Sequence, residues 1–301
     1  MAAYIGELAG LATSILWSGT STFFTLAGRK IGSLVLNRIR LVMAAIFLVI
    51  THWILYGEPL PLGAAGERVI WLSISGVIGL VLGDAFLFQA FVLIGPRLSM
   101  LLMSLAPVLA TITSWLWLNE VLGWMQVLGI AVTTLGIGFV VVDRPQANHS
   151  VEEKRDYVRG VLFGFGGAAG QALGLVTSKL GLGGDFPALS GNVIRMLAAV
   201  IVMWILTLLA GQGKLTLQRF FQAGTARYYV LGGAIVGPFL GVWLSLISVQ
   251  NAEVGVASTL MSLTPIFLLP VGRILFKEQI GWKAVAGTLV ALLGVALLFI
   301  V

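Results

Sequence analysis

The pentapeptide MSLAP at residues 103–107 returns as MSLTP at residues 261–265, 158 positions further along the chain. Other pairs keep this offset or one within a few residues of it: Glu120 and Glu278, Gly123-Trp124 and Gly281-Trp282, Gly136 and Gly294, Asn37-x-Ile39-Arg40 and Asn192-x-Ile194-Arg195, Gly6 and Gly160. One short match can arise by chance, but this many in register indicate an internal duplication. The chain is therefore predicted to consist of two copies of a unit of roughly 150 residues.

The composition indicates an integral membrane protein and excludes several functional classes. Hydrophobic residues make up 58% and charged residues 10% of the chain, whereas soluble domains carry about 25% charged residues. The net charge of +6 comes from residues standing singly between apolar runs, so no nucleic-acid partner is expected. Cysteine is absent, His52 and His149 are far apart, and no Gly-x4-Gly-Lys-Ser/Thr motif occurs. We therefore expect neither an enzyme nor a metal or other cofactor.

Apolar runs divide the chain evenly. A bilayer core needs about 20 apolar residues for each spanning helix. Runs of this kind are found at residues 5–27, 33–55, 70–92, 98–118, 124–142, 160–180, 188–210, 228–248, 254–276 and 282–301. They predict an all-α polytopic membrane protein with ten transmembrane helices, five in each copy.

An odd number of helices per copy means that the second copy enters the membrane from the opposite side. The predicted architecture is thus two inverted five-helix repeats, residues 1–142 and 160–301, joined by a linker at 143–159. Inverted repeats are typical of secondary transporters. Fifteen Lys and Arg residues fall on one face of this arrangement and two on the other, with Arg195 inside a helix. By the positive-inside rule the linker is cytoplasmic and both termini lie outside, in a multi-pass protein of the inner (plasma) membrane.

Small residues and prolines recur in both copies. Ser75, Gly79 and Gly83 correspond to Gly233, Gly237 and Gly241, and residues at every fourth position form strips on which helices can approach closely. Pro107 and Pro265 each remove a backbone hydrogen bond and are predicted to kink their helices. Kinks at matching positions suit a pair of gates.

Asp84 is the strongest candidate for function in the membrane interior. It lies near the middle of the third predicted helix, where a carboxylate is costly unless it faces a partner or a cavity. Its repeat counterpart is Val242. A scaffold residue would tend to occur in both copies, so Asp84 is interpreted as a proton acceptor or a counter-charge for a substrate ammonium, with a hydrogen bond to a neighbouring helix as the alternative.

Arg40 and Arg195 each lie about two turns inside a helix. Because the repeats are predicted to be inverted, Glu278 falls on the side of Arg40 and Glu120 on the side of Arg195. Ion pairs between the halves are therefore predicted for Arg40 with Glu278 and for Arg195 with Glu120, although both acids could equally be helix-end residues.

Aromatic and mildly polar residues on neighbouring helices could surround Asp84 and line a cavity, where a π face attracts an organic cation. The candidates are Trp17, Phe88, Gln89, Met100, Met103, Ser104, Gln171, Trp243, Ser258 and Ser262. Each of them alone could also be an ordinary core or lipid-facing residue.

The duplicated pattern resembles a known family. A Pro, about a dozen apolar residues, Glu, Gly-Trp and Gly-x6-Gly occur at 107–136 and again at 265–294. This is similar to the ten-helix EamA-type branch of the drug/metabolite transporter superfamily, and Trp17 and Arg40 stand where that family often has Trp and Arg. The resemblance covers nearly the whole chain. It implies a secondary carrier that binds small organic solutes between its halves and often exports them.

The predicted function is therefore alternating-access transport of small organic metabolites or drugs, amino-acid-like or cationic, with protons and the lipid bilayer as further partners. One alternative is an exchanger of nucleotide-sugars or phosphorylated metabolites, which should carry several cavity Lys or Arg. A lipid-modifying membrane enzyme is the other. The sequence is compatible with a monomer.

Overall fold

The computed structural model describes the chain except for residues 1–3, 119–121, 143–150, 184–185, 252–259 and 299–301. Its described residues form helices, turns and loops without a β-strand. The first half contains α1 (Ile5–Ile31), α2 (Ser33–Tyr56), α3 (Gly66–Gly76), the π-helical η2 (Val77–Gly83), α4 (Asp84–Met103), α5 (Leu105–Leu118) and α6 (Trp124–Val142). The second half contains α7 (Val151–Leu182), α8 (Ala188–Leu209), α9 (Gly213–Phe221), α10 (Ala226–Ala234), the π-helical η3 (Ile235–Gly241), α11 (Val242–Asn251), α13 (Thr264–Ile274) and α14 (Trp282–Leu297).

Each predicted apolar run contains helix, but the elements do not by themselves fix the number of membrane crossings. Six described helical stretches are long and apolar enough to span a bilayer, and three further apolar helices are shorter. The stretch Gly66–Met103 contains the predicted third run and the first residues of the fourth, whose remainder forms α5, and Gly95 breaks its helical geometry with φ 78°. Helix α7 begins at Val151, so residues 151–159, predicted as part of a linker, are helical.

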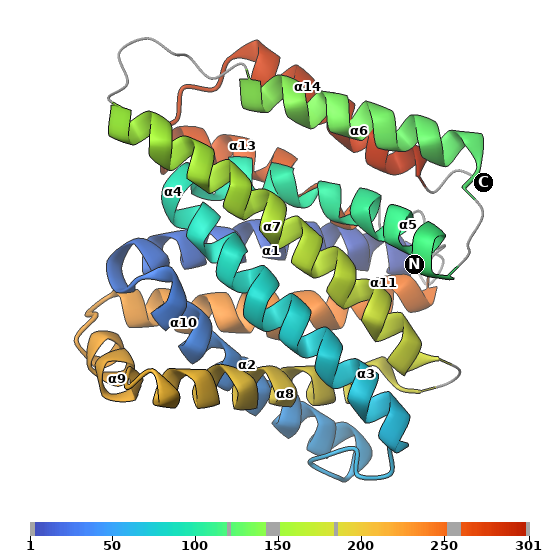
Figure 1. Cartoon of the computed structure of the whole chain (residues 1–301), viewed down its shortest axis with the longest axis vertical. Coiled ribbons are helices and arrows are strands. Elements are labelled where there is room, and N and C mark those ends of the chain that lie inside the picture. Colours follow the sequence, from blue (N-terminus) through green and yellow to red (C-terminus); the bar gives the residue numbers. More distant parts are fainter. Residues whose placement is uncertain (1–3, 119–121, 143–150, 184–185, 252–259, 299–301) are drawn as a thin grey trace.

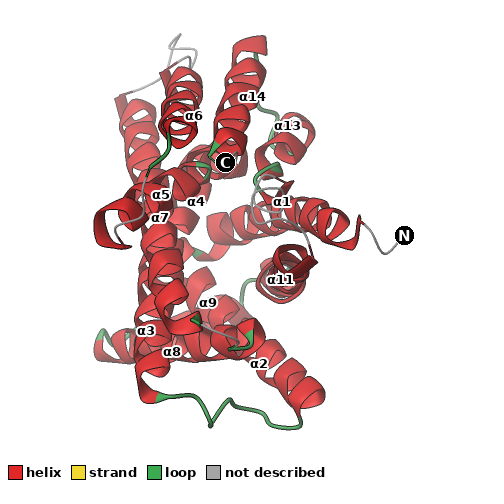
Figure 2. Cartoon of the chain, turned by 90° about the vertical axis from the view of Figure 1, so that its right-hand side faces the viewer, coloured by secondary structure: helices red, strands yellow, loops and turns green. Residues whose placement is uncertain are grey.

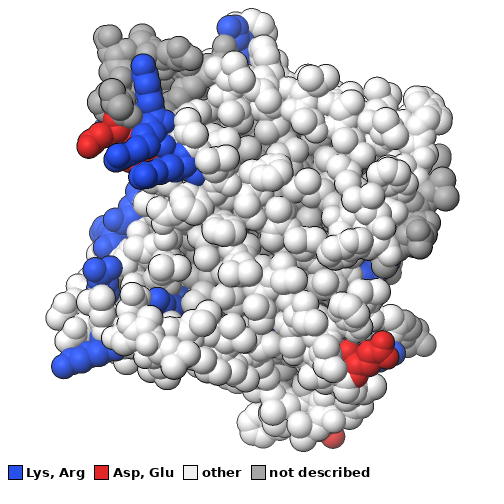
Figure 3. Space-filling model, in the orientation of Figure 1, with Lys and Arg blue, Asp and Glu red and all other residues white. Residues whose placement is uncertain are grey.

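Most of the long helices run across the view of Figure 1, with α6 and α14 at one end of the molecule and α2, α3, α8 and α9 at the other. Figure 2 shows α1 and α11 lying between these two groups. In Figure 3, Lys and Arg side chains gather along the left edge and a broad face beside them is nearly free of charge. An uncharged band of this kind is what a lipid-embedded surface requires.

The two halves pack against each other through equivalent sets of helices. Helix α1 of the first half packs along α10, η3 and α11 of the second, and α7 of the second packs along α3, η2 and α4 of the first. Helices α6 and α14, which occupy matching places in the two copies, pack against each other. The duplication in the sequence is therefore reflected in the packing, and the fold has two repeats.

Glycines allow these backbones to approach. A Cβ added at Gly83 would lie 3.2 Å from the Gly170 Cα, and one added at Gly136 would lie 2.9 Å from the Gly287 carbonyl oxygen. Ser75 adds a hydrogen bond by donating to the Gly174 carbonyl. The predicted small-residue strips are thus contacts between the halves, as expected where helices associate by close packing.

The third helix of each repeat contains a π-helical turn at the same place. Residues 77–83 and 235–241 are equivalent at the repeat offset of 158. A π turn contains an i→i+5 hydrogen bond, and it often lies near functional sites. The segments end directly before Asp84 and Val242.

The helices are interrupted in the turn before Pro107 and Pro265. The break falls at Ser104, three residues before Pro107, and at Ser262–Leu263, just before Pro265. A proline removes the hydrogen bond to the residue four positions earlier, which accounts for a break at this place. Both prolines lie in the first turn of the helix that follows, α5 and α13, where a missing N–H costs little. The kink of the helix axis stays a prediction.

Candidate functional site

Asp84 is bound from both halves of the protein. It is the first residue of α4 and is buried. Arg40 of α2 forms an ion pair with its Oδ2, and the Gln171 amide of α7 donates to its Oδ1 at 2.6 Å. The carboxylate therefore connects two helices of the first half to one helix of the second.

Loss of the ion pair between Arg40 and Asp84 should lower the stability of the protein, because both side chains are buried. The Arg40 side chain is 4% exposed and that of Asp84 8%. A buried pair compensates the desolvation of both charges, whereas loss of one partner leaves the other uncompensated and costs about 3–5 kcal/mol. The structure shows the arrangement that the sequence offered as the alternative for Asp84, hydrogen bonds to neighbouring helices, and the sequence had paired Arg40 with Glu278 instead.

The widened turn of η2 helps to hold Arg40. The Asn37 amide donates to the Leu80 and Val81 carbonyls at 3.3 and 3.4 Å, and its Oδ1 accepts from Arg40 Nε at 3.0 Å. The Phe88 ring lies under the Arg40 guanidinium, 4.9 Å from its carbon to the ring centroid. Asn37 and Phe88 thus fix the direction from which Arg40 reaches the carboxylate.

Arg195, the repeat counterpart of Arg40, has no such partners. Its Nε is buried without a hydrogen bond, and within the described part of the chain its side chain forms no ion pair. It interacts electrostatically with Asp84. A Cβ added at Gly79 would lie 3.7 Å from Arg195 Nη2 and 3.8 Å from Gln171 Oε1, so the guanidinium lies beside η2.

The pairing predicted for Arg40 and Glu278 is not the one found. Glu278 Oε2 accepts from Arg97 Nε at 2.6 Å, which connects α4 to the segment between α13 and α14. Arg40 is instead engaged by Asp84, which begins a neighbouring helix of its own half. Glu120, the predicted partner of Arg195, lies outside the described residues.

The remaining candidates are spread over several environments. Trp17 of α1 lies against Gly241, and Gln89 accepts from the Ser33 hydroxyl at 2.6 Å. Met100 and Met103 pack on a core cluster that includes Phe88.

Ser104 is buried at the break before α5, and Ser262 lies in the turn before α13. Ser258 lies outside the described residues. The structure therefore groups Asp84, Gln171, Phe88 and Arg40, but not the whole predicted set.

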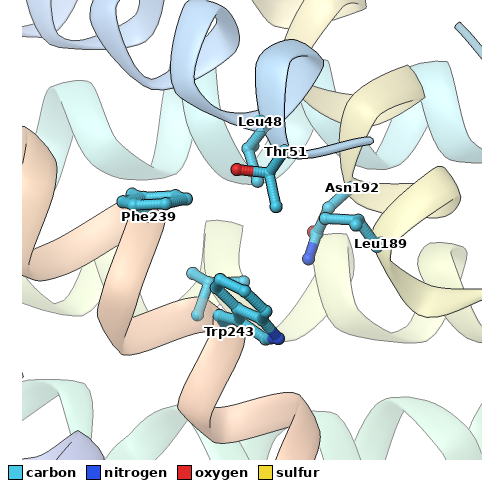
Figure 4. A pocket seen from close by; sticks show the side chains of 7 residues that line it. Leu48, Thr51, Leu189, Asn192, Phe239 and Trp243 are labelled. Atoms are coloured by element: carbon cyan, nitrogen blue, oxygen red, sulfur yellow. The ribbon is translucent and has the colours of Figure 1, made fainter. Parts of the chain in front are cut away.

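Trp243 lines a small depression between the two halves (Figure 4). The side chains around it leave no room for a water molecule. Leu48 and Thr51 reach it from α2, Leu189 and Asn192 from α8, and Phe239, Val242 and Trp243 from η3 and α11. In Figure 4 the side chains of Phe239 and Trp243 lie on one side and those of Leu189 and Asn192 on the other.

Sequence reasoning missed Asn37, Asn192 and Arg97 as parts of these sites. The two Asn residues were visible only as members of the repeated Asn-x-Ile-Arg motif. Because Arg follows Asn by three positions, the two side chains lie on the same side of a helix, which is the signal that could have singled them out. Arg97 was counted only as one basic residue among fifteen. In the part of the chain that the structure describes, no group of three or more His, Asp or Glu could hold a metal ion.

Comparison with known proteins extends these observations. No significant match to a curated protein was found. A crystal structure described only as that of a protein matches over 97% of this chain and 95% of its own, with 18% identity and a TM-score of 0.63, and shows that the fold occurs elsewhere. The sequence model of the EamA-like transporter family matches residues 4–142 and again residues 158–300. The chain, with its two matching halves, belongs to the EamA-like transporter family and is a multi-pass membrane transporter.

Proposed function

We propose that the protein is a secondary transporter that moves a small organic solute by alternating access, as the two halves rock about a site in the membrane interior. The observation that carries this proposal is the cluster of Arg40, Asp84 and Gln171, because it links a buried ion pair of the first half to a polar side chain of the second half. The repeats are inverted in this proposal, both termini lie outside the inner (plasma) membrane, and the direction is export.

Polar contacts between the halves outside the Asp84 cluster support the proposal. Arg97 of α4 forms an ion pair with Glu278, which follows α13 in the second half. Arg29, at the basic end of α1, lies over the Phe276 ring at 5.1 Å, in the same region. A polar connection of this kind can open and reform without moving the apolar core, which is what a gate on one side of the membrane must do.

Asp84 is the proton acceptor in this proposal. In the conformation described, Oδ1 and Oδ2 each already accept a hydrogen bond, so the carboxylate offers a substrate cation no unshared charge. A shift between the halves would separate Gln171 from Asp84 and change its hydration, and the carboxylate could then take up a proton.

The test is an uptake screen in proteoliposomes that contain the purified protein. Amino acids, sugars, cationic dyes and organic carboxylates are offered with and without a pH gradient, and protein-free liposomes are the control. Accelerated exchange of at least one class when the same solute is preloaded inside supports a carrier. Absence of exchange for every class, from protein shown to be folded, would contradict the proposal.

A further inference from the structure

Helix α9 differs from its neighbours in length and in the residues that it exposes. Its nine residues, Gly213–Phe221, extend over about 14 Å, which is about half the thickness of a bilayer core. The helix lies between α8 and α10 at the left edge of Figure 1, where Lys and Arg side chains gather in Figure 3. It is therefore placed at one end of the bundle, where an embedded protein meets the lipid headgroups.

One face of α9 is bound to the rest of the protein. Thr216 is buried, and its hydroxyl accepts from Arg38 Nη1 of α2 at 2.8 Å, while Arg38 Nη2 donates to Gln212 Oε1 at 2.7 Å. Phe220, one turn after Thr216, packs on the core cluster that contains Phe24. These contacts fix the rotation of α9 about its own axis, and so they fix the face that it exposes.

The exposed side of α9 carries both apolar and basic side chains. Leu217 and Phe221 are neighbours on the helix surface and are 43% and 67% exposed. Lys214 and Arg219 are exposed as well. A helix with basic residues on its polar side and with exposed Leu and Phe is typical of helices that lie in the plane of the membrane interface.

The positive charge around α9 is not balanced by acidic residues. Arg227 at the start of α10 is a further exposed basic residue, and no Asp or Glu occurs between residues 186 and 252. Within the described residues, Lys214, Arg219 and Arg227 form no ion pair. The start of α7 differs, because residues 151–159 contain three acidic and three basic side chains. The surface at α9 therefore suits an anionic partner that also accepts apolar side chains.

We propose that α9 lies in the membrane interface and that Lys214, Arg219 and Arg227 bind the phosphate groups of anionic phospholipids, with Leu217 and Phe221 among the acyl chains. This inference goes beyond the proposed transport function and holds for any solute. An acidic segment of another protein would match the charges, but it would not provide the hydrocarbon in which Leu217 and Phe221 are stable.

A fluorophore on α9 tests this assignment, and the absence of native cysteine makes the labelling specific. Gln218→Cys, at an exposed position of α9, is labelled with bimane, and the protein is placed in nanodiscs of mixed phosphatidylcholine and phosphatidylglycerol. A nitroxide quencher is carried on the acyl chain of one lipid or the other. Phosphatidylglycerol should be enriched at α9 about fivefold or more, an effect that one Lys or Arg near an anionic surface already provides. Equal quenching by both lipids would overturn the inference and leave the surface to an acidic protein segment.

Two double variants locate the site. Lys214→Gln with Arg219→Gln should remove most of the preference for phosphatidylglycerol. The matched control, Lys154→Gln with Arg155→Gln, removes the same charge from exposed positions of α7 and should leave the preference unchanged. A preference that persists in the α9 variant, or that falls equally in both variants, refutes the site.

Salt provides a second measurement that needs no substitution of the basic residues. Raising the ionic strength from about 0.1 M to about 1 M shortens the Debye length from about 10 Å to about 3 Å. The preference for phosphatidylglycerol should then fall, because exposed charges are strongly screened. A preference that salt leaves unchanged contradicts binding through Lys214, Arg219 and Arg227.

Discussion

The buried pair of Arg40 and Asp84 should show strong energetic coupling. Asp84→Asn leaves the Arg40 charge buried, and Arg40→Gln leaves the Asp84 charge buried, so each single change should lower the free energy of unfolding by about 3–5 kcal/mol. The double variant removes both charges. It should be less destabilised than the sum of the singles by about 3 kcal/mol or more, because neither variant side chain carries a charge that needs a partner.

The measurement is a double-mutant cycle of unfolding in a fixed detergent or lipid nanodisc. A coupling of about 3 kcal/mol corresponds to more than a hundredfold change in the ratio of folded to unfolded protein, which denaturant titration resolves. The matched control is the exposed pair of Asp156 and Arg159, whose side chains are 47% and 56% exposed and lie 3.9 Å apart. Its cycle should give a coupling below about 0.5 kcal/mol.

Additive effects of Arg40→Gln and Asp84→Asn would refute the reasoning, since additivity means that the two charges do not compensate each other. Transport by the same variants separates stability from function. Asp84→Asn keeps the side-chain shape, and where the protein remains folded its transport should fall strongly or lose its pH dependence. Wild-type rates with a wild-type pH profile would leave Asp84 as a packing residue only.

Three further predictions concern the contacts between the halves and the orientation of the chain in the membrane. Gly170→Ala should destabilise the protein because its Cβ would overlap the Gly83 backbone, whereas Gly138→Ala, with open space around its Cβ, should not; thermal unfolding of both decides this. Arg97→Cys combined with Glu278→Cys should be bridged by a bifunctional methanethiosulfonate reagent, on a background without native cysteine, and the bridge should arrest exchange until it is reduced; unaffected exchange in the bridged protein would contradict a gate here. Lys154→Cys should react with an impermeant maleimide in right-side-out vesicles only after permeabilisation, and labelling of intact vesicles would invert the proposed topology.

Much of the fold could be predicted because a residue pattern that occurs twice in register is stronger evidence than one that occurs once. The helical class, the apolar runs and the glycine contacts all follow from residues that occur twice, such as Gly79 and Gly237. The breaks at Ser104 and Ser262–Leu263 lie in the turn before Pro107 and Pro265, close to where the sequence predicted kinks. A single sequence indicates that a proline disturbs a helix, but the residue at which one helix ends and the next begins depends on the packing of the preceding turn.

The site was harder to predict because it depends on asymmetry between the copies. Asp84 was identified because the second copy has Val242 at the equivalent position. Its partner Arg40 was not identified, because an Arg occurs at that position in both copies and Arg40 was paired with Glu278 only from their predicted side of the membrane. The distance between two helices of the same half is a tertiary property. Whether Arg40 reaches Asp84 while Arg195 stays open depends on how closely α4 and α11 approach their neighbours, and no residue pattern in either helix records it.

The π-helical turns change the angular phase of the helices that contain them. A π turn holds one residue more than an α turn, so everything beyond it is rotated by about 100° relative to an unbroken α-helix. A helical wheel drawn through residues 66–103 is therefore out of phase on the two sides of η2. The face that meets α7 before residue 77 and the face that carries Asp84 after residue 83 are therefore offset by about 100° from the positions that an unbroken α-helix would give them, and the same holds on either side of η3.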